Sequence, residues 1–189
     1  DGGTGSGVGT GTCHVDGRTI SYNRGYYYKE TYGTPGTIEL IFADCDVTTL
    51  PNQVINGIFI SFTTSEDTLP EGTFPYSNSE EDMNTWGYVE IYDYNPTQDV
   101  EFYTYNYMND WNNGYESGDM VVTRNGSHYR IEINDLKLLK DADEDGGIGS
   151  FDPKTSGSFV WEGELMDLTS WMNMEGYGRS LSNGHPWGK

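Results

Sequence analysis

Apolar and polar residues alternate with a period of two along much of this chain. In the segment 128–133, the apolar residues Tyr129 and Ile131 alternate with the charged residues Arg130 and Glu132. Successive side chains of a β-strand point to opposite faces of the sheet, so this pattern predicts a strand with one buried face.

Other segments rich in β-branched and aromatic residues predict further strands. The segment 55–64 (INGIFISFTT) is apolar on both faces, so we expect it to lie centrally in its sheet. The remaining predicted strands are 12–15, 18–22, 26–28, 37–44, 86–94, 100–107, 120–123 and 158–165. One segment, 136–140, is a candidate helix, but it is too short to change the prediction of an all-β fold.

Tight turns join several of these strands. Asp16-Gly17 and Asn125-Gly126 are dipeptides that tolerate φ > 0 and therefore favour two-residue hairpins. Turn signals that recur every 8–12 residues or so indicate an antiparallel β-sandwich or barrel. We expect a single all-β domain over 12–168, a flexible Gly-rich tether over 1–11, and an irregular tail over 169–189 that packs on the domain.

The composition is strongly acidic and rich in aromatic residues. Thirty Asp and Glu residues against 10 Lys and Arg give a formal net charge of −20. Nucleic acids and anionic membranes are bound through basic surfaces, so we expect neither as a partner. The 15 Tyr, 7 Phe and 5 Trp residues indicate a folded chain. The acidity favours solubility, with cation binding or an extracellular setting as the alternative.

Two cysteines, Cys13 and Cys45, both fall in or beside predicted strands. A disulfide that pins the N-terminal strand is one interpretation, and it requires an oxidising compartment. Two buried thiols that behave as small apolar residues are the other.

An acidic loop follows the strand at 128–133. Asp141, Asp143, Asp145 and Gly147 lie at positions 1, 3, 5 and 7 of an EF-hand-like spacing, and Asp152 lies at position 12. This spacing predicts a calcium site. The alternative is a plain hairpin connection, since Asp and Gly are good turn residues, no helices flank the loop, and position 12 is Asp instead of the longer Glu.

Aromatic residues near Asn, Asp and Gly form a second candidate site. Flat rings stack on sugars, while amides and carboxylates bind their hydroxyl groups, so this combination is typical of carbohydrate sites. The candidates are Trp86, Tyr103, Tyr105, Trp111 and Tyr115. The alternative is that these residues pack in a tyrosine-rich β protein.

Several short motifs resemble those of a known group of proteins. They are LPEGTFPY (69–76), the hairpin of 117–133, the IGSF segment at 148–151, and the closing strand of 161–165. Together they resemble the β-rich, lipoprotein-type domains of secreted and surface proteins of gut Bacteroidetes. The resemblance implies an exported β-sandwich or calycin-like barrel, at the outer surface or in the periplasm, that is lipid-anchored in its full-length form. It implies no activity.

Three functions are therefore considered. The leading hypothesis is a non-enzymatic, cell-surface domain that binds an extracellular ligand such as a glycan or a surface protein. The alternative is a structural or assembly component of the cell surface. A glycoside hydrolase is third. Its two catalytic carboxylates are defined by their separation in space, which a sequence does not give. The sequence contains neither an HExxH nor a GxSxG motif.

Overall fold

A computed structural model of the chain describes residues 5–30, 36–49, 53–79, 81–94, 103–109, 115–141 and 151–170, with the backbone alone for 103–106 and 151–152. The strands are β1 (Val8–Val15), β2 (Arg18–Glu30), β3 (Thr37–Ala43), β4 (Ile55–Thr63), β5 (Gly72–Phe74), β6 (Thr85–Tyr94), β7 (Tyr103–Met108), β8 (Met120–Asn125), β9 (His128–Asp141), β10 (Phe151–Glu164) and β11 (Met166–Asp167). A short 3₁₀ helix, η1 (Val47–Thr49), follows β3.

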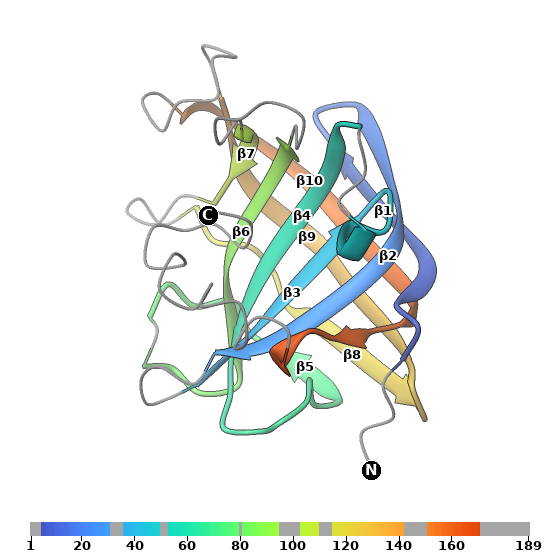
Figure 1. The fold of residues 1–189 in the computed structure, drawn as a ribbon. Helices are drawn as coiled ribbons and strands as arrows, with labels where there is room; N and C mark the ends of the chain where they lie inside the picture. The colour runs from blue at the N-terminus through green and yellow to red at the C-terminus, as the bar shows by residue number, and fades with distance from the viewer. Residues whose placement is uncertain are drawn as a thin grey trace.

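Eight of the strands form a closed antiparallel barrel (Figure 1). Their order is β10-β1-β2-β3-β4-β6-β7-β9, and pairing of β9 with β10 closes the ring. The predicted all-β class and the barrel alternative are thus confirmed, and the closed barrel fits a calycin-like architecture. The described strands form one continuous sheet, so the two sheets of a sandwich are not seen in this part of the chain.

Three further strands extend the wall of the barrel. The long strand β9 pairs with β8 near its start and with β7 near its end, and β5 pairs with the outer edge of β8. The short strand β11 runs parallel to β2 beside Tyr26 and Tyr27. Paired or covered edges expose fewer free backbone groups to other chains.

The two predicted hairpins form, but one is shifted by a residue. Asp16 and Gly17 have φ of 50° and 71°, as a type I′ turn requires. In the second hairpin Asn125 pairs with His128, so the turn residues are Gly126 and Ser127. Gly126 has φ of 64°, which suits the first position of a type II′ turn.

Two boundaries differ from the sequence prediction. The segment 136–140 is part of β9, where Leu136 and Leu138 are buried, and it is not a helix. The predicted tether over 1–11 is wrong at its end, because β1 begins at Val8. A Cβ at Gly9 would lie 2.4 Å from the ring of Trp161, so this glycine makes room for a core side chain. Residues 171–189 of the predicted tail lie outside the described part of the chain.

Apolar side chains from all eight barrel strands fill the interior. The ring of Phe42 lies 4.9 Å from that of Phe159 and 5.0 Å from that of Trp161, measured between centroids. A second apolar cluster covers the outer face of β2, β3, β4 and β6; we call it the outer aromatic cluster. Its members are Tyr26, Tyr28, Ile41, Ala43, Val47, Ile55, Phe59, Tyr92 and Leu168.

Both cysteines are free thiols. Cys13 lies in the barrel interior, whereas Cys45 packs against the outer aromatic cluster on the other side of the wall. Burial raises the pKa of the Cys13 thiol to about 12. The structure therefore agrees with the interpretation of two separate thiols and not with a disulfide between Cys13 and Cys45.

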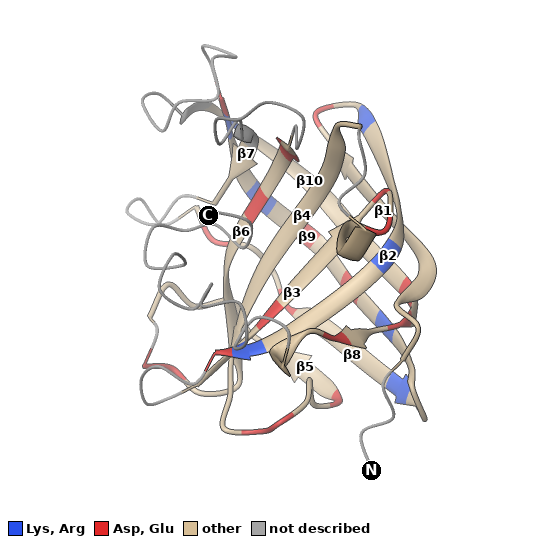
Figure 2. Ribbon diagram, in the orientation of Figure 1, with Lys and Arg blue, Asp and Glu red and all other residues tan. Residues whose placement is uncertain are grey.

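Charged residues are interspersed along the strands (Figure 2). Basic positions on the described strands are separated from one another and do not form a continuous stripe, as a phosphate-binding surface would require. Within the described ranges, no helix is both long enough and apolar enough to cross a membrane.

Candidate ligand-binding site

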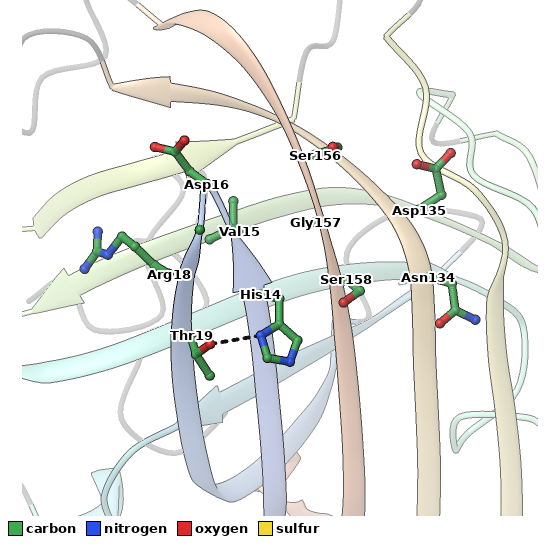
Figure 3. Close-up of a pocket in the computed structure, with 11 residues that line it drawn as sticks. His14, Val15, Asp16, Arg18, Thr19, Asn134, Asp135, Ser156, Gly157 and Ser158 are labelled. Carbon is green, nitrogen blue, oxygen red and sulfur yellow. Dashed lines mark hydrogen bonds between the residues drawn. The ribbon is translucent and has the colours of Figure 1, made fainter.

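A polar hollow of about 360 Å³ lies on the outer wall of the barrel, beside the β1–β2 turn (Figure 3). Because the interior is filled, this hollow lies on the outside of the barrel. It is lined by His14, Val15, Asp16, Gly17, Arg18, Thr19, Asn134, Asp135, Ser156, Gly157 and Ser158. Most of these side chains are polar, so the hollow is suited to a ligand that both donates and accepts hydrogen bonds.

Four of the lining residues form a polar row across neighbouring strands. His14 is the cross-strand partner of Thr19 on β2 and of Ser158 on β10, and Asn134 follows on β9. The His14 Nδ1 atom and the Thr19 hydroxyl share a hydrogen bond of 3.0 Å. In Figure 3 the His14 ring stands between Thr19 and Ser158. Adjacent strands are about 4.8 Å apart, so the row presents a polar group at each such step.

A β-bulge shapes one wall of the hollow. Between the pairs Leu136–Gly157 and Ile133–Phe159, β9 has two residues, Asn134 and Asp135, where β10 has one. Bulges bend the strand and redirect side chains, and they are enriched near functional sites. Here the bulge leaves the side chains of both residues exposed at the hollow.

One of the residues that line the hollow, Gly157, is required by the close packing of two strands. A Cβ at Gly157 would lie 2.0 Å from the carbonyl oxygen of His14, so β1 and β10 could not approach each other as they do with a larger residue there. Gly157 pairs with Val15 and Leu136, whose side chains face the interior, so its contribution to the hollow is the close approach of β1 and β10.

Ion pairs fix the rim. Lys137 binds Asp135 at 2.6 Å, which raises the pKa of the lysine amine above its ordinary value. Lys140 binds Asp16 at 3.3 Å. Exposed ion pairs add little stability, but these two join β9 to the bulge and to the β1–β2 turn.

Two of the residues predicted to bind a ligand, Trp86 and Tyr115, have described side chains, and these two lie in different environments. The prediction that Trp86 binds a ligand is wrong. Trp86 is fully buried in the core, and its indole Nε1 donates a hydrogen bond to the carbonyl oxygen of Gly118, so a surface ligand cannot reach its ring. Tyr115 is partly exposed beside the hollow. Tyr103 and Tyr105 lie on β7, but their side chains are outside the described part, as is Trp111.

The acidic loop connects two antiparallel strands. Asp141 is buried at the end of β9 and pairs with Phe151 at the start of β10. Asp143, Asp145 and Gly147 lie outside the described residues, as does the side chain of Asp152. Among the residues that are described, no three His, Cys, Asp or Glu side chains form a group that could hold a metal ion. The calcium site therefore stays a prediction.

Two buried carboxylates, which were not among the predicted sites, lie on the outer face of the sheet. Glu39 and Glu90 are 5% and 1% exposed. The Ser61 hydroxyl donates to Glu39, and the Tyr88 hydroxyl donates to Glu90 at 2.6 Å. Burial, with the nearby charge of Glu39, raises the pKa of Glu90 to about 8 despite the bond from Tyr88. Such low exposure closes both carboxylates to a substrate.

These features define the molecule as a small closed antiparallel β-barrel with a filled interior and a polar hollow on its outer wall. Comparison with protein families, curated proteins and solved structures finds no match to this chain. A fold of this kind does not specify a function, which depends on the chemistry of the site.

Proposed function

We propose that this chain is an exported binding domain of the cell surface, and that its ligand is a glycan held in the polar hollow. The observation that carries the proposal is the row of Thr19, His14, Ser158 and Asn134. Hydroxyl, imidazole and amide groups each donate and accept hydrogen bonds, which matches the alternating demands of sugar hydroxyl groups.

The filled interior and the charge narrow the ligand class. An apolar ligand of the kind enclosed by hollow barrels would need the space that Phe42, Phe159 and Trp161 occupy. A net charge of −20 opposes a polyanion. A neutral, hydroxyl-rich molecule avoids both conflicts.

Affinity gel electrophoresis tests the proposal. Native gels that contain a plant or microbial polysaccharide should retard the wild-type protein, and His14→Ala should migrate as in a gel without polysaccharide. His128→Ala is the matched control, since His128 is also exposed and lies on β9, outside the hollow. Retardation that is equal in all three proteins would place binding elsewhere.

One observation favours the alternative of a structural or assembly component. The aromatic residues Tyr26, Tyr28, Phe59 and Tyr92 are closed to solvent on the outer wall, where a sugar-stacking platform would be exposed. If a glycan array and the gels both show no binding, this alternative replaces the binding proposal. Release of reducing ends from a polysaccharide would instead support a hydrolase.

Export and anchoring belong to the same proposal and rest on the sequence resemblance. Expression of a full-length form in a Gram-negative host with labelled palmitate should yield a labelled product that fractionates with the membrane. Soluble, unlabelled product would contradict the lipid anchor.

We also propose Ca²⁺ for the acidic loop that starts at Asp141. A cation bound by the native state alone raises the melting temperature as its concentration increases. Added Ca²⁺ should therefore raise Tm and EDTA should lower it. An unchanged Tm would reduce the loop to a plain hairpin connection.

A further inference from the structure

Tyr115 is held in a defined orientation by three contacts. Its hydroxyl donates a hydrogen bond of 2.8 Å to the carbonyl oxygen of Thr155 on β10. The ammonium groups of Lys154 and Lys137 lie 4.8 and 5.7 Å from the centre of its ring, within the range of cation–π attraction. The ring is therefore fixed before any ligand arrives.

The contacts of Tyr115 are those of a surface residue. It is partly exposed and belongs to neither apolar cluster among the described residues, in contrast to Tyr26 or Tyr92. Among the described residues, its recorded contacts are with a backbone oxygen and two lysine side chains. Packing in the core therefore does not explain its position.

Tyr115 and the polar hollow share one wall. Thr155, which accepts the bond from Tyr115, directly precedes Ser156, which lines the hollow. Lys137 contacts the Tyr115 ring and also binds Asp135, another lining residue, at 2.6 Å. One step along β10 and one ion pair thus connect the ring to the hollow.

The Lys154 side chain near the Tyr115 ring can give way to a ligand. Lys154 is exposed, and none of the ion pairs formed within the described part of the chain includes it. A ligand can displace such a side chain from the ring at little cost, since none of the described carboxylates pairs with it. The described lining residues of the hollow offer hydrogen-bonding groups, and none of them is Phe, Tyr or Trp. The adjacent Tyr115 ring supplies the flat apolar face that these residues do not.

We infer that the binding site continues from the polar hollow across β10 onto Tyr115, so that its ligand is an oligosaccharide with one sugar unit in the hollow and a second stacked on the Tyr115 ring. This inference rests on the proposed glycan-binding function. It adds a second subsite and a minimum length of two sugar units.

Calorimetric titration with a chain-length series tests the inference. The ligands are the monosaccharide and the oligosaccharides of two to six units cut from the polysaccharide that retards the protein. Affinity should rise about tenfold from one unit to two, as expected for one stacked ring worth about 1.4 kcal/mol. Tyr115→Ala should abolish this rise and leave binding of the monosaccharide unchanged.

Two further variants separate the inference from the proposed function. Tyr115→Phe keeps the ring and loses only the bond to Thr155, so it should retain most of the rise. His14→Ala should weaken every ligand in the series. If the wild type binds one unit as well as six while His14→Ala still weakens binding, the second subsite is overturned and the glycan function stands. If the wild type binds no member of the series, both are overturned.

Discussion

Replacing Glu90 with glutamine should make the protein more stable at neutral and alkaline pH. Glu90 is 1% exposed on the outer face of β6, and Glu39 lies close enough for its charge to act on it. Glutamine has nearly the same shape, has no charge, and retains an oxygen that can accept the bond from Tyr88. The substitution therefore removes the cost of a buried charge with little change in packing.

The size of the effect follows from the pKa of Glu90. Burial raises this pKa from 4.5 to about 8, so the native state holds the proton more tightly than the unfolded chain does. The stability from this proton is fully present below pH 4.5 and is lost as the pH rises through about 8. At about 1.4 kcal/mol per pKa unit, the loss reaches about 3 kcal/mol by pH 7 and at most about 5 kcal/mol above pH 8.

Urea unfolding followed by tryptophan fluorescence from pH 4.5 to 9 measures the effect. Glu90→Gln should gain about 2–4 kcal/mol over the wild type at pH 8 and should match it, or be slightly less stable, at pH 4.5. Glu162→Gln is the control, because this side chain is 57% exposed on β10. Parallel pH profiles for Glu90→Gln and the wild type would refute the reasoning.

Three further predictions test the packing and polar contacts. Asn109→Ala should lower the unfolding free energy by about 2–3 kcal/mol, since the buried Asn109 side chain accepts the backbone N–H of Val89 at 3.1 Å; an unchanged urea midpoint would contradict this. Gly9→Ala should cost about 1–3 kcal/mol through its clash with Trp161, and Trp161→Phe in the same chain should recover part of that loss, whereas simple additivity would argue against the contact. Bonds from Ser6 and Ser127 lower the pKa of Glu164 to about 2, so they stabilise the fold above pH 4.5 and are lost as the pH falls through about 2. The Tm deficit of Glu164→Gln should therefore shrink over that interval, and a constant deficit would count against the bonds.

Strands could be predicted from the sequence because their signal is local. Alternation of apolar residues marked β3 and β9, and Asp16-Gly17 marked the first turn. The pairing of β10 with β1 could not be predicted, because it joins segments about 150 residues apart in the chain. For the same reason Gly9 was interpreted as part of a flexible tether, although Trp161 requires a glycine there.

The candidate site was less predictable than the fold. His14, Ser158 and Asn134 occupy the solvent-facing positions of three strands, and the sequence contains many such positions. Only the pairing of β1, β9 and β10 brings them together, and the bulge at Asn134 depends on register. Trp86 is of a residue type that is common in carbohydrate sites, but tertiary packing places it in the core. Tyr115 is the predicted residue that the described structure places beside the hollow.

The most direct test of the glycan site is an NMR titration of the ¹⁵N-labelled protein with the oligosaccharide that it binds. The hollow predicts that the largest amide shift changes occur at His14, Asn134 and Ser158, with smaller changes at Thr19. The same titration of His14→Ala should show none of these changes at equal ligand concentration. Shift changes centred on the outer aromatic cluster, or no changes in the wild-type protein, would contradict the account.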